Sequence, residues 1–235
     1  MSLVEDATAT PQQAAPGAPH ASARLEVAGL EVQRGDRRLF TDLDFTVASG
    51  ELLHVRGPNG SGKTTLLRAL CGLLLPQAGA IRWNGEVIRR LGEEFTRDVI
   101  YLGHLNGIKH DLTGVENLRV AATLDGDAVE EAAIWEALQR IGLGGFEDLP
   151  TSVLSQGQKK RVALARLLLT GARLWILDEP FVALDVKAVA LLESLIVAQV
   201  ARGGLVIMTT HQEVALTSGT IRTLDLGTAG QMRGA

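Results

Sequence analysis

Hydrophobic and polar residues alternate over residues 25–32 and again over 45–47, as in strands that bury one face and expose the other. Turn-forming residues at 35–36 and 49–50 follow these segments. Residues 52–56 are more continuously apolar and lead directly into a glycine-rich segment. The first quarter of the chain is therefore predicted to be rich in short strands.

The pattern then changes to a helical period. Residues 64–75 predict a helix that ends before a proline, and short strands are predicted at 80–83 and 99–102. From about residue 113 to residue 169, apolar residues recur at helical spacing, and 156–169 is predicted as a separate helix within that region.

The last third of the chain alternates between the two patterns. Strands are predicted at 174–177, 205–209 and 221–226, with a helix over 186–202 between the first two. The order of strands, then helices, then a βαβ unit predicts an α/β core that carries a helical insertion.

The domain organisation follows from the same pattern. Residues 1–23 are rich in Ala, Pro, Thr and Gln and lack periodic apolar positions, so they are predicted to form a disordered tail. Residues 24–235 are predicted to form a single domain, with the helical insertion over about 104–165, because neither an internal repeat nor a linker is apparent.

The composition excludes several classes of protein. With 23 Lys and Arg against 27 Asp and Glu and a pI near 5.8, the chain shows no sign of bulk nucleic-acid binding. The single cysteine, Cys71, lies in an apolar run and is expected to be a small buried hydrophobe. No segment approaches the ~18 consecutive apolar residues of a spanning helix, and the N-terminus lacks signal-peptide features. We therefore expect any membrane role to come through a partner.

Residues 57–64 match the G-x-x-x-x-G-K-[ST] phosphate loop at every defined position. Glycines let several backbone N–H groups point at one anion, and the helix that follows offers the positive end of its dipole. Lys63 is expected to reach the terminal phosphates, and the Thr64 hydroxyl is expected to bind Mg²⁺. The alternative, a glycine-rich turn with a chance lysine, is disfavoured by the apolar strand before the loop and the helix after it. The predicted nucleotide-binding residues here are Gly57, Pro58, Asn59, Gly60, Ser61, Gly62, Lys63, Thr64 and Thr65.

Two acidic residues end the apolar strand predicted at 174–177. Strands of this kind belong to parallel sheets buried on both faces, in which ligands gather at the carboxyl ends of the strands. Asp178 is predicted to bind Mg²⁺, and Glu179 is predicted to activate the attacking water as a general base. A solvated strand end is the alternative for this pair taken by itself.

The sequence Leu-Ser-Gln-Gly-Gln at 154–158 narrows the class, because it closely resembles the LSGGQ signature of ABC ATPases. The Ser155 hydroxyl and the Gly157 N–H would form a second anion site at the beginning of a helix, and Gln158 belongs to the same predicted site. A plain serine cap before an amphipathic helix is the alternative. The position of the segment shortly before Asp178 matches the order of motifs in that family.

Two more segments resemble the ABC ATPase family. Residues 183–185 resemble its D-loop, and His211 matches its switch histidine, a candidate catalytic residue beside Glu179 and Lys63. The resemblance implies an α/β phosphate-loop NTPase core of ABC type with an antiparallel β subdomain and an inserted helical subdomain. It also implies ATP and Mg²⁺ as cofactors, and a homodimer in which each ATP is sandwiched between one phosphate loop and the other copy's signature.

Two positions depart from the family pattern. His104 takes the place of the Gln that normally follows the strand at 99–102, and an imidazole could still bind a metal or a water. Arg34 takes the place of the aromatic residue that stacks on adenine. Its guanidinium could stack on the base, or it could be a solvated turn residue, and the sequence leaves these two interpretations open.

Segments 103–109, 145–150, 175–181 and 209–212 resemble the haem-exporter ATPases of bacterial cytochrome c maturation (CcmA-type). That resemblance implies integral membrane transporter subunits of the CcmB and CcmC type as partners, at the cytoplasmic face of the bacterial inner membrane. It implies an ATPase that powers haem export or release without binding haem itself. The alternatives are an ABC transporter ATPase for another cargo and a soluble ABC ATPase outside transport, and no basic stripe supports a nucleic-acid partner.

Overall fold

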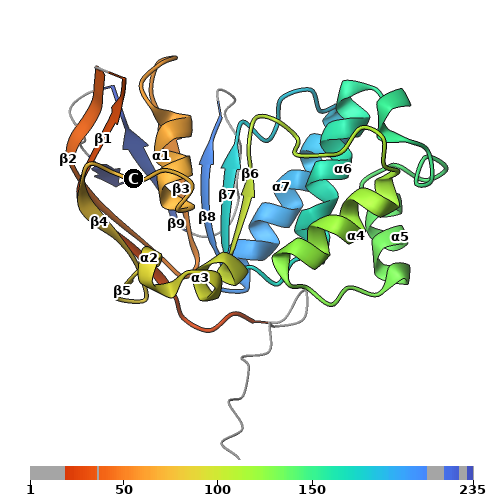
Figure 1. Cartoon of the computed structure of the whole chain (residues 1–235), viewed down its shortest axis with the longest axis horizontal. Coiled ribbons are helices and arrows are strands. Elements are labelled where there is room, and N and C mark those ends of the chain that lie inside the picture. The colour runs from red at the N-terminus through yellow and green to blue at the C-terminus, as the bar shows by residue number, and fades with distance from the viewer. Residues whose placement is uncertain (1–18, 36, 211–219, 228–231, 235) are drawn as a thin grey trace, which may run out of the picture.

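The computed structural model describes residues 19–35, 37–210, 220–227 and 232–234. Two sheets and the helices around them make up the described part of the chain (Figure 1). At the predicted boundary of the N-terminal tail, the backbone N–H of His20 donates to the carbonyl of Arg202 at 2.8 Å. Ala23 is also buried, so the chain already contacts the fold a few residues before the boundary predicted from the sequence.

The first sheet is antiparallel and has the strand order β2-β1-β4-β5. Its strands are β1 (Arg24–Arg34), β2 (Arg37–Ala48), β4 (Ala78–Trp83) and β5 (Glu86–Val87). The alternating apolar residues of β1 and β2 are the buried ones, as their period of two requires. This sheet is the antiparallel β subdomain expected from the sequence.

The second sheet carries the strand order β10-β9-β3-β8-β7-β6. Its strands are β3 (Glu51–Arg56), β6 (Val99–Leu102), β7 (Leu174–Asp178), β8 (Leu205–Thr209), β9 (Thr220–Asp225) and β10 (Met232–Gly234). β3, β6, β7, β8 and β9 run parallel, and β10 pairs antiparallel with β9. Every residue of β7 and β8 is buried, which explains their continuous apolar sequence.

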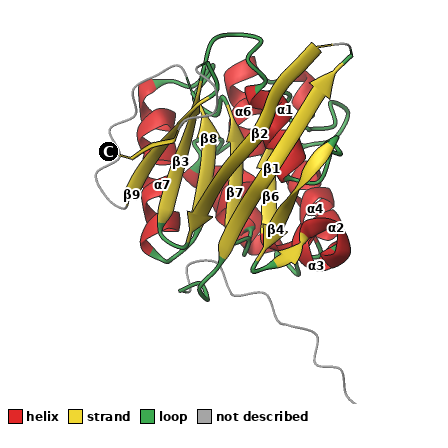
Figure 2. Ribbon diagram, turned by 90° about the vertical axis from the view of Figure 1, so that its left-hand side faces the viewer, coloured by secondary structure: helices red, strands yellow, loops and turns green. Residues whose placement is uncertain are grey.

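The helices lie between the sheets and on the far side of the parallel sheet (Figures 1 and 2). Their bounds are α1 (Lys63–Leu70), α2 (Ile88–Leu91), α3 (Glu93–Asp98), α4 (Gly114–Asp125), α5 (Glu131–Arg140), η1 (Thr151–Val153), α6 (Gln156–Leu169) and α7 (Val186–Ala201). One core cluster joins both sheets to α1, and the other joins the parallel sheet to α4, α5, α6 and α7. The described helices include none that is long and apolar enough to cross a membrane.

Helix α1 ends at Leu70, five residues earlier than the sequence predicts. Gly72 takes a φ of +73°. The N–H of Leu73 donates to the carbonyl of Arg68, and the N–H of Gly72 donates to the carbonyl of Ala69. This is the Schellman arrangement that closes a helix with a glycine in the left-handed region. The apolar run continues past the glycine, so periodicity alone placed the end of the helix too late.

Candidate functional site

The phosphate loop joins β3 to α1, and its backbone depends on glycine. Gly62 has a φ of +99°, and a Cβ there would lie 3.2 Å from atoms of Leu39 and Phe40. Gly57 has a φ of +148°, and its Cβ would lie 2.6 Å from Ser61 Oγ. A side chain at either position would be strained and crowded, so the sequence motif corresponds to a real steric requirement.

Lys63 is held in the loop before any ligand binds. Its Nζ donates to the carbonyls of Gly57 at 2.8 Å and Pro58 at 3.3 Å. The ammonium therefore lies over the loop, beside the first turn of α1, where the positive end of the helix dipole also favours an anion.

The two acids stand at the carboxyl end of β7, as predicted from the sequence. Thr209, paired with Asp178 in the neighbouring strand β8, donates its hydroxyl to Asp178 Oδ1 at 2.7 Å. The same hydroxyl accepts from the backbone N–H of Glu179 at 3.0 Å. Glu179 has a φ of +48°, an uncommon value for a residue with a side chain. Thr209 thus fixes the direction in which both acidic residues leave the strand.

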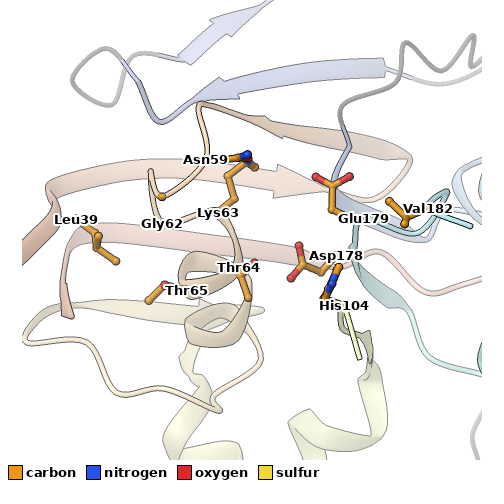
Figure 3. A pocket seen from close by; sticks show the side chains of 11 residues that line it. Leu39, Asn59, Gly62, Lys63, Thr64, Thr65, His104, Asp178, Glu179 and Val182 are labelled. Atoms are coloured by element: carbon orange, nitrogen blue, oxygen red, sulfur yellow. The ribbon is translucent and has the colours of Figure 1, made fainter. Parts of the chain in front are cut away.

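A cavity of about 380 Å³ brings these groups together (Figure 3). Its lining residues are Leu39, Asn59, Gly60, Gly62, Lys63, Thr64, Thr65, His104, Asp178, Glu179 and Val182. The structure therefore assembles the phosphate loop, both acids and His104 around one space, although the loop and the acids lie more than a hundred positions apart in the sequence. A polyanion fits here, because loop amides, an ammonium and a helix N-terminus converge on it.

The donor atoms in this cavity fit Mg²⁺. Asp178 is 2% exposed, and its Oδ2 is buried with no hydrogen-bond partner among the described residues. The Thr64 hydroxyl lines the same cavity. Carboxylate and hydroxyl oxygens beside a phosphate are the ligands that Mg²⁺ prefers. The structure shows no cluster of three or more His, Cys, Asp or Glu side chains in the part of the chain it describes, so an all-protein metal cage is not found there.

The signature segment lies at the beginning of α6, outside this cavity. The N–H of Gln158 donates to Ser155 Oγ at 3.2 Å, and the N–H of Ser155 donates to Gln158 Oε1 at 2.9 Å. This capping box is a feature that both interpretations of the sequence share, the second anion site and the plain serine cap, so the anion site stays a prediction. A Cβ on Gly157 would lie 2.9 Å from the carbonyl of Ala183. Ser155, Gly157 and Gln158 are thus beside the D-loop of their own chain and do not line its phosphate cavity.

The D-loop segment is tied to the signature helix. Asp185 caps α7 by accepting from the N–H of Ala188 at 2.9 Å, and Arg161 of α6 donates to its other oxygen at 2.5 Å. The backbone hydrogen bond from Ala188, followed by the charge of Arg161, lowers the pKa of Asp185. The carboxylate therefore stays ionised and links α6 to α7.

Three residues that the sequence pattern does not single out lie at the site or in the larger cavity beside it: Thr209, Lys160 and Tyr101. Thr209 orients the two acids. Lys160 of α6 is 6% exposed, and burial lowers the pKa of its ammonium while the charges of Asp178 and Glu179 oppose that change. Burial, followed by the charge of Asp178, raises the pKa of Tyr101. The sequence places Lys160 in the helix predicted over 156–169, shortly after the signature, and gives no other signal for it.

Two predicted residues have no described side chain. Arg34 ends β1, but its side chain lies outside the described part of the structure, so its contact with adenine stays a prediction. His211 lies in residues 211–219, which are also outside the described residues. Its role as a switch histidine stays a prediction.

A second cavity of about 610 Å³ opens beside the first and forms a groove. It is lined by α1, the segment at 103–107 and α6, and His104 with Thr64 and Thr65 lines both spaces. Leu105 on its rim is 82% exposed, whereas Leu118 of α4 is 1% exposed and belongs to the core.

Comparison with known proteins gives three kinds of match. Residues 40–182 match the family model described as ABC transporter. The chain is 55% identical over 202 residues to the "Cytochrome c biogenesis ATP-binding export protein CcmA" of Nitrosomonas europaea, covering 86% of this chain and 95% of that protein. It is 55% identical over 203 residues to the protein of the same name from Dechloromonas aromatica, covering 86% and 100% of the two chains.

Solved structures give the same fold. A structure described as that of the ATP-binding subunit of an ABC transporter superposes with a TM-score of 0.78 at 29% identity. The superposition covers 89% of this chain and 88% of the other. The antiparallel sheet, the parallel sheet and the helical insertion are therefore shared with a protein of known class.

Proposed function

Because the chain belongs to the ABC transporter family and resembles its CcmA-type ATP-binding export proteins, we propose that it hydrolyses ATP to drive an export step in cytochrome c biogenesis. The observation that carries this proposal is the single cavity in which Lys63, Thr64, Asp178 and Glu179 converge. The proposed partner and pathway rest on the family resemblance, and the proposed chemistry of ATP hydrolysis rests on the residues of this cavity.

The phosphate loop binds and orients the triphosphate. Loop N–H groups and the first turn of α1 hold the phosphates, and Lys63 exchanges its two carbonyl partners for phosphate oxygens. Since little covalent chemistry falls to the protein in phosphoryl transfer, most of the rate enhancement comes from positioning and from stabilising charge.

Glu179 orients the attacking water and takes its proton. Its backbone is fixed by Thr209, which also fixes Asp178, so the base keeps a constant position relative to the loop. We also propose that His211 contacts the γ-phosphate beside Glu179. This role rests on the family resemblance alone.

Mg²⁺ would be held by the Thr64 hydroxyl and by Asp178, with His104, which lies beside Asp178 in the same cavity (Figure 3), as a further ligand. When bound, the ion would supply positive charge to neutralise the phosphates of the nucleotide. The buried, unpartnered Oδ2 of Asp178 supports this assignment.

A second copy of the chain completes each site. Ser155, Gly157 and Gln158 line no part of their own phosphate cavity, yet they present a capped helix N-terminus, which is a favourable place for a phosphate. A head-to-tail homodimer brings this N-terminus over the nucleotide of the partner, so one chain contributes two half-sites.

The groove beside the cavity receives an integral membrane subunit of the CcmB or CcmC type. Leu105 on its rim offers apolar surface, and His104 connects the groove to the nucleotide. The chain then works at the cytoplasmic face of the bacterial inner membrane, where its ATP cycle powers haem export or release.

Affinity purification of the tagged chain from native membranes tests the partner and the pathway. We expect integral membrane proteins of cytochrome c maturation to co-purify, in an amount that rises when ATP turnover is blocked. Recovery of a permease for another cargo would still be consistent with ATP hydrolysis, but it would contradict the proposed role in cytochrome c biogenesis.

A further inference from the structure

We propose that His54 of β3 is a positioning residue for ATP hydrolysis, an inference that rests on the proposed function. Its imidazole donates a hydrogen bond to the carbonyl of Thr210 and so holds the carboxyl end of β8. Thr209, the preceding residue of β8, holds both Asp178 and Glu179. His54 therefore acts on the two acids through the strand that lies between β3 and β7 (Figure 1).

His54 is a buried polar residue inside an apolar strand. It is 7% exposed, and its neighbours Leu52, Leu53 and Val55 all belong to the core. Burying an imidazole costs free energy unless its nitrogens find hydrogen-bond partners. Packing by itself does not require a histidine here, so the hydrogen bonds that this side chain makes are the features that set it apart.

Those hydrogen bonds determine which ring nitrogen carries the proton. Arg56 Nε donates to His54 Nδ1 at 3.1 Å, and a guanidinium has only donors, so Nδ1 is an acceptor. The proton of the neutral ring is then on Nε2, which lies 3.2 Å from the carbonyl oxygen of Thr210. Burial lowers the pKa of His54, which favours the neutral ring. Arg56 thus keeps His54 in the tautomer that donates to Thr210.

The Thr210 carbonyl lies where the pairing of β3 with β8 ends. The last pair of these two strands joins Val55 to Thr209, so His54 adds a side-chain hydrogen bond one residue beyond it. The Thr209 hydroxyl keeps its bonds to the acids, 2.7 Å and 3.0 Å long, only while the end of β8 stays in place, because hydrogen bonds weaken steeply with misalignment. His54 itself does not line the phosphate cavity. Its loss should therefore slow hydrolysis and leave ATP binding unaltered.

Three variants of the full-length chain test this role. His54→Met removes both hydrogen bonds and keeps an apolar side chain of similar length, His54→Gln keeps an amide N–H for the Thr210 carbonyl, and His110→Met alters an exposed histidine. Turnover, affinity for a fluorescent ATP analogue and melting temperature are measured for each. We expect His54→Met to lower kcat roughly three- to tenfold with KM within about twofold. His54→Gln should recover most of the loss, and His110→Met should match the unmodified chain.

A double-variant cycle with Thr209→Val tests the route through β8. Thr209→Val keeps the shape of the side chain and removes the hydroxyl that holds the acids. Adding His54→Met to Thr209→Val should lower kcat by less than about twofold more, since the hydroxyl that His54 positions is already gone. Losses of kcat that multiply in the double variant would overturn the inference, as would equal losses in His54→Met and His54→Gln.

Nitrogen-15 NMR of the histidine-labelled chain checks the geometry without a variant that removes the hydrogen bond. The signals that disappear in His54→Gln belong to His54, and at neutral pH they should show the proton on Nε2. A proton on Nδ1 would overturn the inference even if His54→Met did not fold. If turnover requires Glu179 but is equal in His54→Met and His110→Met, this inference alone is wrong. If turnover does not require Glu179, the proposed function is wrong and this inference with it.

Discussion

The phosphate cavity and the signature end of α6 are both proposed to bind phosphate, yet only the cavity brings its groups together within the described chain. The cavity gathers the loop, both acids and His104 around a space of about 380 Å³. The signature end has a formed capping box but faces the D-loop of its own chain, with no residue in that cavity. The first region is assembled by the fold of one chain, whereas the second depends, in the proposed function, on a second copy.

The difference lies in how each region is held together. Asp178 and Glu179 are fixed by strand pairing and by Thr209, so their geometry is a property of the sheet. Ser155 and Gly157 are positioned by the beginning of α6 and by the neighbouring D-loop, and they do not line the phosphate cavity of their own chain. The acids therefore have a geometry set by the sheet, whereas the proposed role of the signature depends on a second copy of the chain.

The largest effect is expected from Glu179→Gln, which leaves the cavity intact and removes the proposed base. Turnover should fall by roughly 10²–10⁴-fold, because general-base catalysis contributes about that much. Affinity for ATP should stay within a few-fold, measured with a fluorescent analogue beside phosphate release. Glu136→Gln, an exposed change on α5, serves as the matched control. Unaltered phosphate release in Glu179→Gln would remove this residue from the base role.

Ser155→Ala tests the other region. A hydrogen bond to a charged group is worth about 1.5–3 kcal/mol, so turnover should fall by roughly ten- to hundredfold while one copy still binds ATP. Loss of the cap should also cost the helix about 1 kcal/mol. Ser152→Ala, at an exposed serine on the same segment, controls for the general effect of removing a hydroxyl. If Ser155→Ala weakens ATP binding to a single copy as much as it slows turnover, Ser155 acts within its own chain's site, and the distinction between the two regions is wrong.

Leu105→Asp tests whether the membrane partner binds in the groove, because the change should weaken partner binding and leave nucleotide binding unaltered. Leu105 is 82% exposed, and burying a leucine against a partner is worth about 1.5 kcal/mol or more. We expect roughly tenfold less membrane partner to co-purify, with ATP affinity unchanged. Leu105→Met keeps the apolar surface and should co-purify normally. Equal recovery of partner with Leu105→Asp would show that docking occurs elsewhere.

The smallest effect concerns the stability of the insertion that carries the signature. Burial, with the charge of Asp125, raises the pKa of Asp127 to about 6 from 3.8. The folded chain therefore binds this proton more tightly than the unfolded chain, and stability falls as the pH rises from about 4 through 6. Asp127→Asn should raise the melting temperature at pH 8 by a degree or two and change it less at pH 4. The exposed Asp148→Asn should show no such difference between the two pH values.

Much of the fold could be predicted because the spacing of apolar residues along the chain determines where most helices and strands form. The apolar runs of β7 and β8, the alternation in β1 and the helix from Gln156 to Leu169 were all expected within a residue or a few of their observed bounds. The end of α1 was predicted too late, because the Schellman glycine at position 72 stands inside a run that stays apolar. Thr209 could not be recognised as a member of the site, because its role depends on the two acids of a neighbouring strand.

The sequence by itself determined the family, the phosphate loop and the identity of the two acids, since each of these is a short run of residues whose spacing the chemistry requires. Only the tertiary structure decided that Thr209 holds both acids, that Lys160 is buried and that the signature residues do not line their own chain's phosphate cavity. The physical reason is that hydrogen bonds and charges act over a few ångströms in space, and folding brings β7, β8 and α6 together from distant parts of the chain.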